Sequence, residues 1–377
     1  MQFATIEEAI AEIQEGRIVI IVDDEDRENE GDLMVAAEKV TPDTINFMAT
    51  HGRGLICLAM TGQQLDELHI PLMVSDHSNT SPYGTAFCVS IEARRNVSTG
   101  ISAFDRAQTV LTAIDTKTKP SDLARPGHIF PLRARDGGVL VRAGQTEASV
   151  DLATAAGLAP AGVICEIMKE DGTMARVPDL VEFAAQHNLK IITVADLIRY
   201  RLRTERFVRK VGETTLPTPH GDFRMMIFES ILDQQTHIAL VKGNIEDGED
   251  VLVRVQTQCL TGHVFGSPAC HCREQMENAM EMISRTGRGV LLYLHEMGRS
   301  SSGGALLDYH GKHGADSNET IGLRGEQREY GIGAQILAAL NVRSMRILTN
   351  HPRKLVALEA YGLKIVAQVP LTTFLRK

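Results

Sequence analysis

The sequence predicts an α+β protein of two mixed domains, and three observations lead to that prediction. The chain has 377 residues, more than a typical single domain. Short apolar runs typical of strands alternate with amphipathic runs typical of helices, and several connections look antiparallel. Two prolines and a glycine within residues 216–221 mark a fresh start after a polar segment. We therefore expect a first domain over residues 1–203, a linker over 204–215 and a second domain over 216–377.

Composition narrows the class of protein. Hydrophobic residues make up 43% and charged residues 23%, as in ordinary globular proteins. A net charge of -9 argues against general nucleic-acid binding but leaves room for small phosphorylated substrates. No apolar run approaches the length of a membrane span, and the N-terminus lacks the pattern of a signal peptide. Six cysteines in a chain of this length are not a disulfide framework. The expectation is a cytoplasmic protein.

The first domain begins with a helix, because Thr5 and Glu8 form a capping box and Gly16 follows as a stop. Expected strands cover residues 17–22, 33–37, 54–60, 85–91, the surroundings of 132, 139–141, 162–168 and 190–194. Expected helices begin near residue 41 and cover 102–113, 146–155, 177–187 and 196–203, with loops at 75–84 and 125–130. In the second domain, strands are expected at 225–229, 237–241, 251–255, 289–294 and 345–349, and helices at 273–285 and 331–340.

The stretch Asp23–Asp32 (DDEDRENEGD) is the strongest chemical signal in the first domain. Seven of its ten residues are acidic, and a buried-type strand leads into it. Carboxylates held this close repel one another unless a cation lies among them, and Mg²⁺ is the usual cation for oxygen ligands. Arg27 adds a planar fork that suits a phosphate or a carboxylate. The alternative is a solvated acidic turn.

Other residues of this domain have two interpretations each. The segment 142–147 (RAGQTE) places small residues before a helix, which suits a phosphate, or else it is an ordinary capped loop. His128 is a candidate acid, base or metal ligand, or a structural hydrogen bonder. Glu166, inside the apolar run GVICEIM, is a candidate general base. Cys57 is in an equally apolar run, where an inert buried thiol is the plain interpretation.

Several long motifs occur in order in this half: DDEDRENEGD, HGRGLICL, SPYGTAF, STGISAFDR, RPGHIFPLRA, RAGQTEASVDL and GVICEIMKEDGTMAR. In these motifs the first domain closely resembles 3,4-dihydroxy-2-butanone-4-phosphate synthase of riboflavin biosynthesis. The resemblance implies a lyase that converts D-ribulose 5-phosphate to formate and L-3,4-dihydroxy-2-butanone 4-phosphate. It also implies Mg²⁺ or Mn²⁺ as cofactor and a homodimer with sites near the subunit interface.

The resemblance assigns roles to individual residues. Glu28 would ligate the metal, Arg27 and Asp32 would contact the sugar phosphate, and the catalytic positions are His128, Glu166 and Cys57. Asp105 also matches an active-site position, and Glu166 would contact the substrate as well. The phosphate end would be held by Arg142, Ala143, Gly144, Gln145 and Thr146. A base near the carbon acids and a divalent cation that spreads developing charge fit this reaction.

One position departs from the family pattern. The family usually has a histidine that ligates the metal where this chain has Gln145. A glutamine carbonyl oxygen can ligate Mg²⁺, although it is a weaker donor and cannot titrate. We expect retained but weakened activity.

The second domain contains Cys259, Cys270 and Cys272, a C-x10-C-x-C pattern that suits tetrahedral Zn²⁺ with one open position. The alternative is three reduced cysteines near one turn. The stretches LPTPHGDF, VRVQTQCLTGHVFGS, NETIGLRGEQREYGIGAQIL and LTNHPRKLVALEAYGLKIVAQVPL resemble GTP cyclohydrolase II. The resemblance implies zinc ligation by the three cysteines and GTP as substrate. The matching site positions are Tyr309, Glu326, Arg328, Thr349 and Lys354.

Departures in the second domain fall on charged positions. Gln258 replaces an acidic residue, and Ala269–Arg273 reads ACHCR where the family usually has RCDCG. Residues 295–303 (HEMGRSSSG) also differ, Glu326 replaces an aspartate, and the stretch between Tyr309 and Asn318 is short. Losing such contacts removes transition-state stabilisation. The leading hypothesis is an active synthase with an inactive cyclohydrolase-like domain of structural or regulatory function. The alternatives are a fully bifunctional enzyme and a non-catalytic interaction protein.

Overall fold

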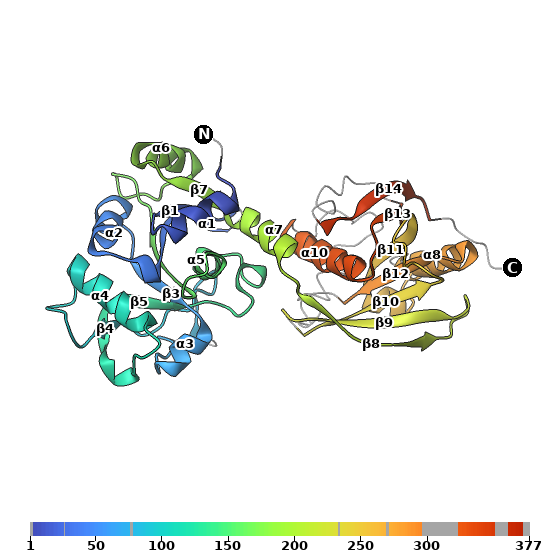
Figure 1. Ribbon diagram of the computed structural model, residues 1–377, viewed down its shortest axis with the longest axis horizontal. Helices are drawn as coiled ribbons and strands as arrows, with labels where there is room; N and C mark the ends of the chain where they lie inside the picture. Colours follow the sequence, from blue (N-terminus) through green and yellow to red (C-terminus); the bar gives the residue numbers. More distant parts are fainter. Residues whose placement is uncertain are drawn as a thin grey trace. The chain divides into compact units, whose positions relative to one another are not determined.

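The structure is a computed structural model that describes residues 3–25, 27–75, 78–232, 234–268, 271–295, 323–350 and 361–371, with the backbone alone for 323–330. The chain divides into two compact units, Met1–Tyr200 and Arg201–Lys377 (Figure 1). Each unit has a seven-stranded mixed sheet covered by helices. The predicted α+β class is therefore confirmed. No helix in these described ranges is long and apolar enough to cross a bilayer.

The sheet of the first unit has the strand order β4-β5-β3-β6-β2-β1-β7. Its strands are β1 (Val19–Val22), β2 (Gly31–Ala36), β3 (Cys57–Met60), β4 (Ile91–Ala93), β5 (Leu123–Arg133), β6 (Ala161–Glu166) and β7 (Lys190–Thr193). Its helices are α1 (Ile6–Gln14), α2 (Pro42–Phe47), α3 (Gly62–Glu67), α4 (Ala103–Ile114), α5 (Gln145–Ala155), α6 (Val177–His187) and α7 (Val194–Thr204). The β1/β2, β2/β6, β3/β6 and β4/β5 pairs are antiparallel, while β1/β7 and β3/β5 are parallel.

Both faces of this sheet are buried. One core cluster joins α1, α5 and the start of α7 to residues such as Met34, Cys57 and Ile164. The other joins α2, α4 and α6 to residues such as Leu33 and Cys165. Successive residues of a strand point to opposite faces, so Asp32 and Glu166 share the face of Met34 and Ile164, which α5 covers.

The second unit has the strand order β14-β13-β11-β12-β10-β9-β8. Its strands are β8 (Val208–Leu216), β9 (Phe223–Ser230), β10 (Thr236–Lys242), β11 (Val251–Thr257), β12 (Gly289–Leu294), β13 (Ser344–Leu348) and β14 (Lys364–Val369). Its long helices are α8 (Cys272–Thr286) and α10 (Leu323–Ala339). Phe228, Val253 and Leu292 pack with Ile336 of α10 in one core cluster.

The structure corrects four local predictions. Residues 125–130 are not a loop but part of β5, which contains a cis Arg125–Pro126 bond; proline is tolerated because the register shifts there. Residues 139–141 are not a strand but belong mostly to the 3₁₀ turn Gly138–Leu140, because an apolar run this short does not define a period. The strand expected at 85–91 begins only at Ile91.

The expected linker 204–215 is the fourth correction, because most of it is the edge strand β8. Every β8 residue is exposed or half-buried, and pairing with β9 rather than an apolar face defines the strand. Within the second unit, α10 is hydrogen-bonded to the segment 202–207 that leads from α7 into β8. The Gln335 carboxamide accepts from Phe207 N–H (2.7 Å) and donates to the carbonyls of Leu202 (2.9 Å) and Glu205 (2.7 Å).

Candidate active site

A hairpin presents the acidic stretch at one end of the first sheet. Strands β1 and β2 pair antiparallel from Val19↔Met34 to Val22↔Gly31, so residues 23–30 form the connection between them. Asp23 organises this connection from inside, with its carboxylate fully covered. It accepts hydrogen bonds from the backbone N–H groups of Glu28 (3.0 Å) and Glu30 (2.9 Å). Internal hydrogen bonds therefore give the acidic run a defined loop conformation.

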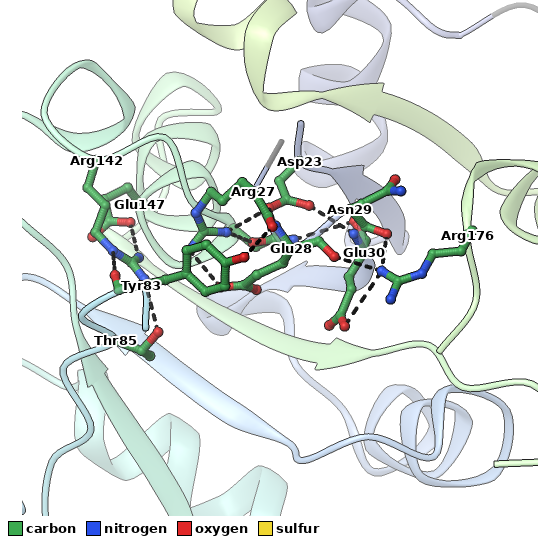
Figure 2. A network of polar contacts seen from close by, with 11 residues as sticks. Asp23, Arg27, Glu28, Asn29, Glu30, Tyr83, Thr85, Arg142, Glu147 and Arg176 are labelled. Carbon is green, nitrogen blue, oxygen red and sulfur yellow. Dashed lines mark hydrogen bonds and ion pairs between the residues drawn. The ribbon is translucent and has the colours of Figure 1, made fainter. Parts of the chain in front are cut away.

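Arg27 is the internal cation of this loop, as Figure 2 shows. Its Nη1 lies 2.8 Å from Asp23 Oδ2, and its Nη2 lies 2.8 Å from Glu28 Oε1. The same Nη1 donates to Gln145 Oε1 over 2.8 Å. The Arg27 side chain is 7% exposed and lies 5.2 Å from the ring centre of Tyr83. One guanidinium thus joins the loop to the first residue of α5.

The N-terminus of α5 faces the loop. Gly144 is its N-cap and supplies no side-chain cap, so the first turn keeps amide groups available for an anion. A Cβ added at Gly144 would lie 2.7 Å from Arg142 Nη1 and 3.0 Å from Arg27 Nη2. A larger residue at position 144 would therefore have to displace these guanidinium groups. The loop and the segment 142–147 therefore converge.

Arg142 is oriented by three partners on two segments (Figure 2). Nη1 bonds the buried Glu147 carboxylate over 2.7 Å, and Nη2 donates to Thr85 Oγ1 over 3.0 Å. Nε donates to the carbonyl of Tyr83 over 3.2 Å. The polar segment 75–85 thus contributes to the site.

Arg176 also bonds the acidic loop, a contact that the sequence did not suggest. It is the residue before α6, and its Nη1 donates to the carbonyls of Glu28 (2.7 Å) and Asn29. Asn29 has a φ of 54°, and its carbonyl turns toward this arginine. Proline at the second position of α6 signals a helix start at that point, but the sequence contains no sign of which loop the arginine would reach.

Asp32 and Glu166 are neighbours across β2 and β6, because the register pairs them directly. Asp32 is 5% exposed, and burial followed by the Glu166 charge raises its pKa well above the usual range. Burial also raises the pKa of Glu166, against a 2.8 Å hydrogen bond from Leu55 N–H to its Oε2. Two buried carboxyls with raised pKa values can share one proton, which suits acid–base work at neutral pH.

Cys57 is buried in β3, and burial raises the pKa of its thiol far out of the physiological range. A protonated thiol is neither a nucleophile nor a base. Burial thus favours the plain interpretation of Cys57 as an inert thiol, while its expected catalytic role stays a prediction.

The structure places His128 and Asp105 in a second polar group. His128 Nδ1 lies 2.6 Å from Glu92 Oε2. Asp105, at the start of α4, accepts from Ser98 Oγ (2.7 Å) and from the backbone N–H of Gly100 (3.0 Å), and these bonds lower its pKa to about 2. These bonds from the 98–102 loop occupy its carboxylate, and the expected active-site role of Asp105 stays a prediction.

Sheet geometry relates His128 to Glu166. His128 stands two residues before Phe130, which pairs with Cys57, and Cys57 in turn pairs with Ile164. His128 is thus at the same end of the sheet as Glu166 but two strands away, about 10 Å at ~4.8 Å per strand. The sequence suggested that both stretches could converge with the acidic loop, but it contained no sign of this separation.

Metal ligands near the loop are few. Within the described ranges, no group of three His, Cys, Asp or Glu residues is placed to hold a metal ion. Glu28 and the oxygen of Gln145 approach the same guanidinium, so they offer two oxygen donors. This small donor set fits Mg²⁺, which usually keeps several waters and binds one or two carboxylates together with its substrate.

The second unit shows only part of its predicted site. Cys259 is buried, and its backbone N–H donates to His263 Nδ1 over 3.1 Å. The same Nδ1 lies 2.9 Å from the hydroxyl of Tyr293, whose pKa is raised by burial and by nearby Cys259 and Cys272. The backbone of Thr349 bonds Val369 over 2.9 Å. Cys270, Tyr309 and Lys354 lie outside the described residues, as do the side chains of Glu326 and Arg328.

Comparison with known proteins assigns each unit. Residues 7–200 match the family described as 3,4-dihydroxy-2-butanone 4-phosphate synthase, and residues 208–370 match GTP cyclohydrolase II. Riboflavin biosynthesis protein RibBA of Aquifex aeolicus is 55% identical, over 98% of this chain and 93% of that protein. The chloroplastic bifunctional riboflavin biosynthesis protein RIBA 1 of Arabidopsis thaliana is 50% identical, over 100% of this chain and 70% of that one.

Solved structures agree with these assignments. RibBX of A. baumannii, described as a two-domain 3,4-dihydroxy-2-butanone 4-phosphate synthase, is 39% identical with a TM-score of 0.79 over 98% of this chain and 100% of that chain. A 3,4-dihydroxy-2-butanone 4-phosphate synthase in complex with two magnesium ions is 40% identical with a TM-score of 0.51, over 54% of this chain and 98% of that one. The chain therefore belongs to the riboflavin biosynthesis proteins in which a 3,4-dihydroxy-2-butanone 4-phosphate synthase domain is followed by a GTP cyclohydrolase II domain.

Proposed function

We propose that the first unit converts D-ribulose 5-phosphate to L-3,4-dihydroxy-2-butanone 4-phosphate and formate. The observation that carries the proposal is the convergence of the acidic loop with the N-terminus of α5. Arg27 joins Glu28 to Gln145 there, and the buried pair Asp32 and Glu166 lies at the same end of the sheet. A site with these groups can bind a sugar, its anionic group and a cation at the same time.

The phosphate end of the substrate is held at α5. The uncapped first turn over Gly144, Gln145 and Thr146 offers amide donors, and Arg142 supplies a fork already oriented by Glu147. Ala143 joins these donors without a side chain large enough to block them. Arg27 contributes a second guanidinium close to Gly144.

Proton transfer is assigned to the buried carboxyl pair. Glu166, which keeps a backbone donor on Oε2, takes the proton from the carbon next to the carbonyl. Asp32, whose pKa is raised well above its usual range by burial and then by the Glu166 charge, lies beside it and contacts the substrate oxygens. His128, fixed by Glu92, is the second acid–base group of the reaction.

A divalent cation, Mg²⁺ or Mn²⁺, fits Glu28 and the carboxamide oxygen of Gln145. Both donors are oxygen atoms, the ligand type that these cations prefer. When bound, it would supply charge stabilisation for neighbouring oxygens of the sugar. The solved relative described with two magnesium ions supports this choice.

We further propose that the chain works as a cytoplasmic homodimer. Large apolar side chains are exposed in the motifs around the site, among them Leu55 (42%), Ile101 (56%) and Phe104 (57%). Apolar groups of this size next to a site are typical of an interface.

Formate release tests the function directly. The purified full-length chain with D-ribulose 5-phosphate and Mg²⁺ should release formate, EDTA should abolish the release, and Glu28→Gln should reduce it at least a hundredfold. Absence of formate with both Mg²⁺ and Mn²⁺ would overturn the proposal and would favour a non-catalytic interaction protein.

For the second unit we propose a nucleotide-binding domain without GTP hydrolysis. The support is in the substitutions, because His271 stands exposed beside Glu274 where an acidic ligand neighbour is usual. Cys259 and Cys272 would hold Zn²⁺ with Cys270, and both described cysteines lie close enough to Tyr293 to raise its pKa. RibBX, described as a two-domain synthase, is consistent with this interpretation.

A fully bifunctional enzyme is the second candidate, and the names of the curated relatives support it. Incubation of the same preparation with GTP decides between the two. Formate and pyrophosphate from GTP would establish the bifunctional enzyme, whereas formate from D-ribulose 5-phosphate alone would establish the inactive second unit. Zinc analysis of the full chain would report on the thiolate site separately.

A further inference from the structure

Tyr83 lies at the surface of the first unit, yet three contacts hold it in place (Figure 2). Its hydroxyl donates a hydrogen bond to the backbone carbonyl of Arg27, and its ring centre lies 5.2 Å from the guanidinium of the same arginine. Its own carbonyl accepts a hydrogen bond from Arg142 Nε over 3.2 Å. The residue is 43% exposed, so packing in a core does not account for its position.

A tight turn presents this tyrosine. Residues 81–84 read SPYG, and type I turns favour serine at the first position, proline at the second and glycine at the fourth. Gly84 has a φ of 64°, and its N–H donates to the carbonyl of Ser81 over 3.0 Å. The side chain of Asn79 accepts from the N–H of Ser81 over 2.9 Å, which braces the start of the turn. The backbone therefore holds Tyr83 as firmly as its side-chain contacts do.

The two arginines that Tyr83 contacts lie close to each other. A Cβ added at Gly144 would lie 2.7 Å from Arg142 Nη1 and 3.0 Å from Arg27 Nη2, so both nitrogens approach one point at the start of α5. Like charges this close repel, which favours conformations that separate them. Glu147 restrains Arg142 from one side over 2.7 Å. An anion that enters between two restrained guanidinium groups gains charge-assisted hydrogen bonds without having to reorganise either group.

We infer that Tyr83 is a positioning residue that holds the guanidinium groups of Arg27 and Arg142 at the spacing that receives the phosphate of the substrate. Its side chain attaches the turn to the acidic loop at Arg27, and its backbone carbonyl then fixes Arg142. One residue thus couples the positions of two cations from different segments. The inference rests on the proposed function only in placing a phosphate between these two arginines.

Binding of inorganic phosphate tests this role without turnover. Calorimetric titration of the full-length protein compares the wild type with Tyr83→Phe, Tyr83→Leu and the control Tyr361→Phe, which alters a half-buried tyrosine of the second unit. Tyr83→Phe loses only the hydroxyl and should weaken phosphate binding about three- to tenfold. Tyr83→Leu also loses the ring and should weaken it at least about twofold further, whereas the control should leave it unchanged. Affinity within twofold of the wild type in Tyr83→Leu would overturn the inference, as would a wild type that binds no phosphate.

A thermodynamic cycle tests the coupling itself. Arg142→Gln is introduced into the wild type and into the Tyr83→Leu background, and phosphate affinity is measured in all four proteins. Because Tyr83 acts partly through Arg142, the loss in the double variant should be at least about threefold smaller than the product of the two single losses. A smaller departure from the product would show that the two residues act independently and would reject the coupling.

Stability measurements separate positioning from support of the fold. The thermal unfolding midpoint of Tyr83→Phe should stay within about 2 °C of the wild type, because only one exposed hydrogen bond is lost. Its KM for D-ribulose 5-phosphate should rise by the same factor as the dissociation constant of phosphate, with a smaller change in kcat. A lower midpoint with unchanged phosphate affinity would leave Tyr83 a structural role alone and would reject the inference.

Phosphate binding and turnover distinguish the two proposals. A protein that binds phosphate with the predicted order of variants but releases no formate rejects the synthase function and keeps the inference. Formate release with unchanged phosphate affinity and unchanged KM in Tyr83→Leu rejects the inference alone.

Discussion

At the scale of single residues, Asp32 and Glu166 are buried carboxyls whose charge would serve the proposed reaction but lowers the stability of the fold. Both lie on the face of the sheet that α5 covers, and both have raised pKa values. The fold therefore favours the neutral form of each carboxyl over its charged form. A side chain with the same shape and no charge should therefore suit the fold better and the reaction worse.

Glu166→Gln tests this conflict. A raised pKa in the folded state means that the stabilising contribution is present at low pH and is lost as the pH rises through the folded-state pKa. The variant should melt a few degrees higher than the wild type at pH 8, with the gap closing at pH 4, and formate release should fall about 10²- to 10⁴-fold. Thermal unfolding at both pH values measures it, and a gap that does not depend on pH would contradict the explanation.

Gly54 controls the position of the same carboxylate. A Cβ there would lie 2.5 Å from the Glu166 carbonyl oxygen and 2.6 Å from its Oε2. Gly54→Ala should therefore displace the base and lower kcat/KM about 10²-fold, since misplacement by about 1 Å costs this much. Gly212→Ala is the control, because open space surrounds that position. Equal activity in the two variants would show that Glu166 tolerates the shift.

The sequence suggested many of the charged residues of the first site but not which of them contact one another. Arg27, Glu28, Gln145 and Arg142 do converge in space. The partners of a side chain depend on contacts between distant segments, and for that reason Arg176 escaped notice. For Cys57 the apolar sequence context allowed both an inert thiol and a catalytic position, and the structure shows that the residue is buried.

At the scale of elements, patterns with a full period were predicted well. The capping box of α1 and the bounds of α6 follow the sequence closely. Elements whose local signals conflict with tertiary pairing were not: β5 contains proline and glycine, yet it pairs with β3 and β4 on its two sides. β8 has no continuous apolar face and depends on β9 for its conformation.

The N-terminus of α5 makes an element-scale prediction. Arg142→Gln removes the charge beside this turn while the buried Glu147 remains. The KM for D-ribulose 5-phosphate should rise about tenfold or more, because a charge-assisted bond to phosphate contributes about 1.5–3 kcal/mol. Arg133→Gln, which loses only its bond to the exposed Asp66, should leave KM unchanged. Steady-state kinetics with inorganic phosphate as a competitor measures the effect, and an unaltered KM and phosphate inhibition in Arg142→Gln would move the phosphate elsewhere.

At the scale of the whole molecule, each unit has its own sheet and core clusters, yet α7 begins in one unit and ends in the other. The buried Gln335 satisfies the carbonyls of Leu202 and Glu205 at the end of this helix. Helix ends leave carbonyls without partners unless something supplies them, and here α10 does.

Gln335→Leu should expose the importance of this connection. Two carbonyls and the Phe207 N–H lose their partner in a buried place, at a cost of about 1–3 kcal/mol for each unsatisfied group. Hydrogen exchange of the full chain should show faster exchange of the Phe207 amide and the start of β8. Gln186→Leu, at an exposed position on α6, serves as the control. Unchanged protection at Phe207 would mean that water replaces the amide.

The hydrogen bonds of Gln335 with residues 202–207 also affect whether the two halves could exist as separate polypeptides. A cut after residue 200 runs through α7, and a cut after residue 207 leaves Leu202 and Phe207, each 3% exposed in the full chain, without the surface that covers them. Gene fission at this junction would thus yield a synthase whose C-terminal segment exposes apolar side chains and tends to aggregate, unless polar residues replaced Leu202 and Phe207. Fusion relieves that liability, so natural splitting of the chain should be accompanied by substitutions at these two positions.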